Sequence, residues 1–230
     1  MIKLIIFDFD DTLIDNQKLD HESFRNICLK FQVYIPTKNE LFKLRNKNHD
    51  AKEIIDIILK KSNKKINKNL FFKKRNSFLS SPDSLNYLTI KPYVRRMIKK
   101  LFSQNYILLI LSIRKKKFLI QNFLEKNDLS IYFENIFNPE NSKLEMRNIS
   151  NAIKTKRQLF KKIFSLYDVK NNEILYVGDS EIDSTVASIY RVKFILVKNP
   201  LMQNNIKFDQ KIDTFKDLEF IVKQISNNVR

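Results

Sequence analysis

The sequence predicts an α/β fold, with a doubly wound, Rossmann-like core around a mostly parallel sheet plus an inserted α-helical cap. Two observations lead to this prediction. Short apolar runs of strand length alternate with stretches whose apolar residues recur at helical spacing. Residues 15–88 differ, because they contain helical patterns but no convincing strand, and they are too long for a simple strand-to-strand connection. We therefore expect a core formed by 1–14 and 89–230 and a cap formed by 15–88.

Four apolar runs are the predicted strands, and the segments between them are the predicted helices. The strands are expected over residues 2–9, 106–111, 173–177 and 193–197. The helices of the core are expected around apolar stripes that begin at Val94, Leu119 and Leu159, with a terminal helix over 215–225. Within 15–88, several apolar stripes, such as those that begin at Phe24 and Ala51, predict amphipathic helices.

The composition limits the class of protein. Of the 230 residues, 43% are apolar and 12% aromatic, which is enough for a packed core and excludes a disordered chain. A single glycine excludes the glycine-rich dinucleotide-binding and Walker A loops, since each needs more than one. A single cysteine, Cys28, excludes a disulfide framework and a cysteine-based structural zinc site. We expect no membrane span and no signal peptide, and hence a cytoplasmic protein.

The net charge is strongly positive. Basic residues number 43 and acidic residues 25, which gives a formal charge of +18. The abundance of Lys, Asn, Ile and Phe is typical of AT-rich coding sequence and accounts for the charge without a function; the alternative is a preference for anionic partners such as nucleic acid. Residues 60–75 contain eight basic residues and no acidic ones. We expect a charged outer helix face there, with a polyanion-binding surface as the alternative.

Acidic residues lie at the end of the first predicted strand, in the segment FDFDDTL at 7–13. Residues two apart on a strand point the same way, so Asp8 and Asp10 are expected to project together into a crevice at the carboxyl edge of the sheet. Two carboxylates that lie so close cannot both ionise freely without a cation. The pair therefore predicts a bound metal ion or a raised pKa.

Polar residues also lie at the ends of the second and third predicted strands. Ser112 ends the second strand, and Asp179 follows the third, with Asp183 one helical turn further on. Lys154 or Lys156, which precede the third strand, would add a basic side chain. Carboxylates from two strand ends, a hydroxyl and a lysine form a pocket suited to Mg²⁺ and a phosphoryl group.

At these segments the sequence resembles the haloacid dehalogenase (HAD) superfamily of phosphohydrolases with a helical cap. The matching segments occur in the family's order: DFDDTL at 8–13, LLILS at 108–112, IKTKRQLF at 153–160 and YVGDSEID at 176–183. The resemblance implies a Mg²⁺-dependent phosphatase that hydrolyses a small phosphorylated metabolite, such as a sugar phosphate, a phosphoglycolate-like acid or a nucleotide, through an aspartyl-phosphate. The alternatives are a phosphomutase of the same superfamily and a non-catalytic, basic nucleic-acid-binding protein on this fold.

The resemblance also implies a role for each residue of the site. Asp8 is the expected nucleophile, and Asp10 is the expected general acid and base. The catalytic group also includes Ser112 and Lys156, with Lys154 as the alternative lysine. The expected substrate-binding residues are Thr12, Asp11, Ile113 and Arg114. The expected Mg²⁺ ligands are Asp8, Asp10 (through its carbonyl oxygen), Asp179 and Asp183.

The two lysines compete for one position. We prefer Lys156, because it continues the apolar stripe of its predicted helix and should therefore face inward. The sequence TKRQ at 155–158 is a capping-box pattern and predicts that this helix begins at Thr155.

The chain departs from the family pattern in its lack of glycine. The resemblance implies glycine at four positions that hold other residues here: Asp11, Tyr93, Asp168 and Arg191. Aspartate tolerates left-handed backbone better than most residues, whereas Arg191 leads us to expect a different helix ending. The single glycine, Gly178, precedes Asp179, and we expect that a side chain there would crowd the strand that carries Asp8.

Overall fold

The chain forms two units of different architecture, one made of residues 1–14 and 90–230 and the other of residues 15–89. The structure is a computed structural model that describes residues 1–47, 49–139, 149–200 and 206–227. Within these residues no helix is long and apolar enough to cross a membrane.

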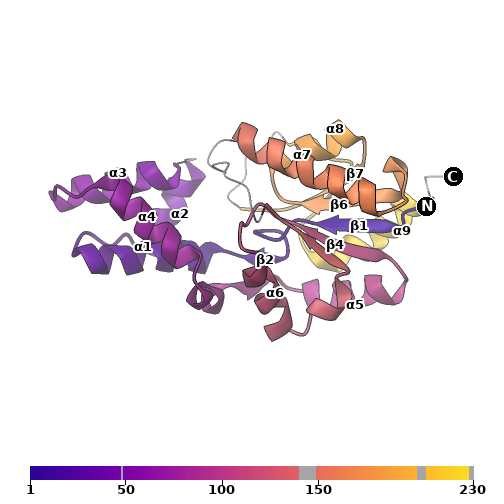
Figure 1. The fold of residues 1–230 in the computed structure, drawn as a ribbon, viewed down its shortest axis with the longest axis horizontal. Helices are drawn as coiled ribbons and strands as arrows, with labels where there is room; N and C mark the ends of the chain where they lie inside the picture. The colour runs from indigo at the N-terminus through magenta and orange to yellow at the C-terminus, as the bar shows by residue number, and fades with distance from the viewer. Residues whose placement is uncertain (48, 140–148, 201–205, 228–230) are drawn as a thin grey trace. The chain divides into compact units, whose positions relative to one another are not determined.

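The larger unit is a parallel sheet with helices on both faces, which confirms the predicted fold class. Its strands are β1 (Leu4–Phe7), β4 (Ile107–Leu111), β5 (Asn135–Phe137), β6 (Ile174–Gly178), β7 (Lys193–Val197) and β8 (Gln210–Ile212). Its helices are α5 (Val94–Ser103), α6 (Lys117–Lys126), α7 (Ile149–Leu166), α8 (Glu181–Tyr190) and α9 (Leu218–Asn227), with short 3₁₀ turns η2 (Ser130–Tyr132), η3 (Asn171–Glu173) and η4 (Phe215–Asp217). Figure 1 shows α7 and α8 over one face of the sheet and α5 and α6 over the other.

The strand order, β5-β4-β1-β6-β7-β8, is that of a doubly wound fold. The chain moves outward from β1 through β4 to β5, then returns to the other side of β1 with β6 and moves outward again. All of these neighbours pair in parallel. The four strands that the sequence predicts are present. The pattern does not predict β5 and β8, because each has only three residues at an end of the strand order and neither forms an apolar run.

The smaller unit is helical. Its elements are α1 (Gln17–Phe31), α2 (Lys38–Asn46), α3 (Ala51–Ser62), α4 (Lys68–Leu79) and the 3₁₀ turn η1 (Pro82–Tyr87). Two short strands, β2 (Ile14–Asp15) and β3 (Thr89–Ile90), pair where the chain enters and leaves it. Capping boxes at Thr37 and Asp50 fix the starts of α2 and α3. The predicted stripes form the core of this unit, with Phe24 and Ile27 from α1 packed among buried residues of α3 and α4.

The basic segment 60–75 is only partly the outer surface that the charge pattern predicts. Arg75 is buried, with 5% of its surface exposed, and its guanidinium pairs with Asp20 at 2.5 Å. Phe71 and Phe72 lie in the core of the helical unit. They are therefore not available on the surface for stacking against nucleic-acid bases, and the remaining basic residues fit a solvated outer face.

Left-handed backbone occurs at three of the four positions where the family resemblance implies glycine. Asp11, Tyr93 and Arg191 have φ values of 57°, 65° and 52°. Arg191 is the C-cap residue of α8, where glycine is common, so the expectation of a different helix ending at this position is wrong. Asp168 is not among the described residues with positive φ.

Candidate active site

The site begins at the carboxyl ends of three neighbouring strands. The central strand β1 lies between β4 and β6, with Phe7 opposite Ile110 on one side and Val177 on the other. Asp8 follows β1, and its backbone N–H donates to the Val177 carbonyl at 2.9 Å. Ser112 and Asp179 follow the flanking strands. This is the point where the strand order reverses, at which open α/β sheets place their ligands.

Side-chain alternation along β1 determines which way Asp8 points. Leu4 and Ile6 pack into the apolar cluster formed with α7 and α8. Asp8 continues this alternate series, so its carboxylate lies on the same face of the sheet. The helices α7 and α8 supply Lys156 and Asp183 on that face.

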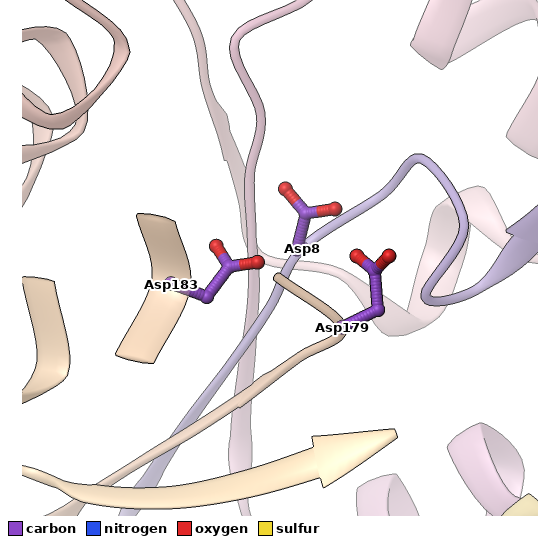
Figure 2. Close-up of side chains that lie close together, drawn as sticks. All are labelled: Asp8, Asp179 and Asp183. Atoms are coloured by element: carbon purple, nitrogen blue, oxygen red, sulfur yellow. The ribbon is translucent and has the colours of Figure 1, made fainter. Parts of the chain in front are cut away.

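Three carboxylates meet there. Oxygen atoms of Asp8, Asp179 and Asp183 all lie within 4.8 Å of one another, and the three residues are almost fully buried. Figure 2 shows their carboxyl groups gathered around one space, with Asp8 and Asp179 on loops that follow strands and Asp183 on a helix. These are three of the four expected ligands. The fourth, Asp10, is expected to bind through its carbonyl oxygen, and its carboxylate is not part of this cluster.

Lys156 is the cation of the cluster. Its Nζ lies 2.6 Å from Asp8 Oδ1, also donates to Asp183 Oδ1, and is 3.1 Å from the hydroxyl of Tyr176. Only 3% of its surface is exposed, whereas Lys154 is exposed to solvent. The structure thus brings Lys156, and not Lys154, to Asp8.

The predicted start of this helix is wrong. Thr155 lies inside α7, which extends upstream at least to Ile149, and its side chain is buried. The TKRQ pattern therefore falls in the interior of a helix, where the buried Thr155 is part of the inward face.

Burial and mutual repulsion shift the pKa values of acidic groups in the cluster. Burial and the nearby charges of Asp183 and Asp179 raise the pKa of Asp8 well above its usual value, despite the ammonium of Lys156. Burial and the charge of Asp183 raise the pKa of Asp179 to about 6. Burial lowers the pKa of Lys156, but the carboxylates of Asp183 and Asp8 outweigh it and leave that pKa raised. When all are ionised, three carboxylates face one ammonium, and the excess of two negative charges matches a divalent cation.

Asp183 is held tightly by its neighbours. The backbone N–H and the hydroxyl of Ser180 both donate to Asp183 Oδ2, and Ser180 in turn caps the start of α8. A Cβ atom on Gly178 would lie 2.6 Å from Asp183 Cγ. The atoms nearest to such a Cβ thus belong to Asp183, and not to the strand that carries Asp8 as the sequence leads us to expect.

Asp179 is oriented by two side chains. The hydroxyl of Thr12 donates to Asp179 Oδ1 at 3.1 Å, and the amide of Asn199 donates to Asp179 Oδ2 at 2.7 Å. Thr12, expected among the substrate-binding residues, is fully buried and points at this carboxylate.

Asp10 pairs with Arg114. The guanidinium holds the Asp10 carboxylate through Nη2 at 2.5 Å and Nε at 3.3 Å, and lies 5.9 Å from the ring centre of Phe9. Burial lowers the pKa of Arg114, but Asp10 outweighs it, and the pKa is raised.

The nearby Ser112 is buried and accepts a hydrogen bond from the Arg114 backbone N–H at 3.1 Å. Asp11 and Ile113 are half-buried in the loops beside them.

Among the described residues, Asn199 and Tyr176 contact the carboxylate cluster but lie outside the sequence prediction. Asn199 follows the fourth predicted strand, so the rule that parallel strands end at one edge would have found it. Tyr176 is a polar residue within an otherwise apolar buried strand, and a buried tyrosine hydroxyl usually has a hydrogen-bonding partner. That signal shows that a partner exists but not which residue it is.

One family model matches most of the chain. The family model of the haloacid dehalogenase-like hydrolases matches residues 5–197. Among curated proteins, none matches the sequence significantly.

Solved structures of similar fold cover nearly all of the chain. A predicted phosphoglycolate phosphatase of Haemophilus somnus is 18% identical with a TM-score of 0.73, over 96% of this chain and 98% of that one. A Bacillus subtilis protein provisionally described as a HAD-hydrolase, solved with magnesium bound, is 17% identical with a TM-score of 0.74, over the same shares. A provisionally assigned β-phosphoglucomutase of Thermotoga maritima is 16% identical with a TM-score of 0.69, over 97% and 99%. On the family match over most of its length, the chain belongs to the haloacid dehalogenase-like hydrolase family.

Proposed function

We propose that this protein is a Mg²⁺-dependent phosphatase that hydrolyses a small phosphorylated metabolite through a phosphoryl group carried on Asp8. The observation that carries the proposal is the buried cluster of three carboxylates with Lys156 bonded to Asp8. A predicted phosphoglycolate phosphatase and a magnesium-bound hydrolase among the proteins of similar fold support the same chemistry.

The residues of the cluster fit a magnesium ion. Mg²⁺ is a hard cation that is bound by carboxylate oxygens. Asp8 and Asp179 would hold it, with the carbonyl oxygen of Asp10 as a further ligand, and Asp183 would act directly or through water. When bound, Mg²⁺ neutralises carboxylate charge and the charge on phosphoryl oxygens.

The reaction proceeds in two steps on the chain's own residues. A carboxylate oxygen of Asp8 forms a bond to phosphorus while the bond from phosphorus to the leaving oxygen breaks, and Asp10, which begins this step as the protonated acid, gives that oxygen its proton. Asp10 then takes a proton from water, whose oxygen bonds to phosphorus as the bond to Asp8 breaks. Inorganic phosphate leaves, and both aspartates return to their starting states.

The neighbouring residues stabilise the transferred group. The Ser112 hydroxyl and the backbone N–H groups near Asp11 and Ile113 would donate to the phosphoryl oxygens. Lys156 holds Asp8 in place and balances charge during transfer. Arg114, now paired with Asp10, would bind the anionic substrate as Asp10 turns to the leaving oxygen.

The helical unit of residues 15–89 would serve as a cap. A cap that closes over a site excludes water and limits the size of the substrate. We therefore propose a small phosphorylated metabolite, such as a sugar phosphate, a phosphoglycolate-like acid or a nucleotide, as the substrate.

A panel of phosphorylated metabolites and an aryl phosphate tests this function. Release of phosphate should require Mg²⁺, stop on addition of EDTA, and be lost in Asp8→Asn. Asp10→Ala should lower turnover by about 10²-fold or more if Asp10 transfers the proton. The exposed Asp213→Asn is the matched control and should keep full activity.

Other outcomes identify the alternatives. Phosphorus NMR that shows a phosphoryl group returned to another position of the substrate would identify a phosphomutase. Salt-sensitive nucleic-acid binding that survives Asp8→Asn, without any hydrolysis, would instead identify a binding protein.

A further inference from the structure

One buried hydroxyl contacts two charged side chains of the cluster and has no role in the chemistry above. Tyr176 lies in β6 and is fully buried. Its ring packs edge-on against Phe160 at 5.3 Å and Phe194 at 5.8 Å between ring centres. Its hydroxyl lies 3.1 Å from Lys156 Nζ and is also bonded to Asp183 Oδ1.

The direction of each hydrogen bond follows from the chemistry of the groups. A lysine ammonium has three donors and no acceptor, so Lys156 must donate to the Tyr176 oxygen. The hydrogen of the Tyr176 hydroxyl is then directed to Asp183, which as a carboxylate only accepts. With Asp8 and Asp183, Tyr176 gives the ammonium three acceptors for its three N–H groups.

We propose that Tyr176 is a positioning residue of this site, which fixes Lys156 against Asp8 and fixes Asp183 beside the metal-binding space. The proposal rests on the proposed function, and it adds a residue to which the family resemblance assigned no role. Partners that orient the groups around a metal typically change its affinity 10- to 100-fold when they are removed.

The hydroxyl, and not the ring, carries this role. Phenylalanine at position 176 would keep the ring contacts with Phe160 and Phe194, so the fold should be retained. It would leave one N–H of Lys156 unpaired in a buried site and remove one donor from Asp183. The ammonium would then shift toward the carboxylates, and Asp183 would lose its fixed orientation.

The chain offers a matched control in Tyr190. Its ring stacks on the same Phe160, at 5.0 Å, while its hydroxyl donates to the backbone carbonyl of Arg157 at 2.7 Å and contacts none of the three carboxylates in any described interaction. Tyr190→Phe thus removes a tyrosine hydroxyl from the same aromatic cluster without changing the site.

The experiment compares Tyr176→Phe, Tyr190→Phe and the unmodified protein. Mg²⁺ binding is measured by titration calorimetry. The kinetic constants kcat and KM are measured with an aryl phosphate as substrate, and the melting temperature is measured in the absence of metal. Tyr176→Phe should weaken Mg²⁺ binding by roughly 10- to 100-fold and lower kcat more than it raises KM. Tyr190→Phe should bind Mg²⁺ and turn over like the unmodified protein.

The failure of the inference is distinguishable from that of the proposed function. Unchanged Mg²⁺ affinity and kcat in Tyr176→Phe, beside an active unmodified protein, would overturn the inference alone, even if the melting temperature fell. An unmodified protein that neither binds Mg²⁺ nor hydrolyses phosphate esters would overturn the proposed function and the inference with it.

Discussion

Replacing Lys156 by methionine should destabilise the core strongly in the absence of metal. Methionine keeps most of the length of the side chain but removes the ammonium that is bonded to Asp8 and Asp183. Both carboxylates are almost fully buried, as is Lys156. The variant therefore leaves buried negative charge without its counter-charge.

The magnitude follows from the burial of the partners. Removing one member of a buried ion pair typically costs about 3–5 kcal/mol of unfolding free energy. Because burial already raises the pKa of Asp8, this group can take up a proton and limit the loss, so we expect about 3 kcal/mol at neutral pH. The difference from the unmodified protein should shrink as the pH falls through the raised pKa of Asp8, because a protonated carboxyl group needs no counter-charge.

Urea unfolding followed by circular dichroism, with EDTA present, measures this loss. Lys154→Met is the matched control: it lies two residues earlier in the same helix but is exposed, and it should change the unfolding free energy by no more than about 0.5 kcal/mol. A loss below about 1 kcal/mol in Lys156→Met, or an equal loss in both variants, would refute the reasoning.

Three further predictions test other parts of the structure. Arg191→Gly should raise the unfolding free energy in urea by about 0.5–1 kcal/mol, because relief of a left-handed φ of 52° outweighs the extra freedom of glycine in the unfolded chain; a decrease would contradict this. Asp20→Asn should lower the unfolding free energy by about 3 kcal/mol, because the guanidiniums of Arg45 and Arg75 share the Asp20 carboxylate. Burial raises the pKa of Asp20, but the two arginines outweigh burial and hold this pKa below its usual value. The stabilisation by the ion pairs is therefore present above the ordinary aspartate pKa and is lost as the pH falls through the lowered pKa of Asp20. A difference in unfolding free energy between variant and unmodified protein that persists in strong acid would contradict this prediction. Calorimetry should show Mg²⁺ affinity falling as pH drops below about 6, because Asp179 must lose its proton to bind a cation; an affinity that stays constant to pH 4 would argue against Asp179 as a ligand.

Much of the fold could be predicted because the relevant signals are local. The apolar runs that become β1, β4, β6 and β7 are visible in the sequence, and the carboxyl ends of parallel strands meet at one edge. That rule alone groups Asp8, Ser112 and Asp179. The inward face of α7 identifies Lys156, because an apolar stripe shows which side of a helix is buried.

The contacts that a local pattern cannot show are those that depend on distances between strands and helices. The pairing of Asp10 with Arg114 joins residues 104 apart in the chain. The spacing of Gly178 and Asp183 does not reveal that the two are in near contact, because that depends on how α8 leaves its strand. Sequence also misplaces the start of α7, since a capping pattern has the same letters at the end and in the middle of a helix.

The central claim is that Asp8 carries the phosphoryl group, and trapping that group tests it most directly. The protein is mixed with Mg²⁺ and an aryl phosphate, quenched in acid during turnover, and treated with borohydride, which reduces an aspartyl-phosphate to homoserine. Peptide mass mapping should find homoserine at position 8 and at no other aspartate. Turnover without modification at position 8, or hydrolysis that persists in Asp8→Asn, would contradict the account.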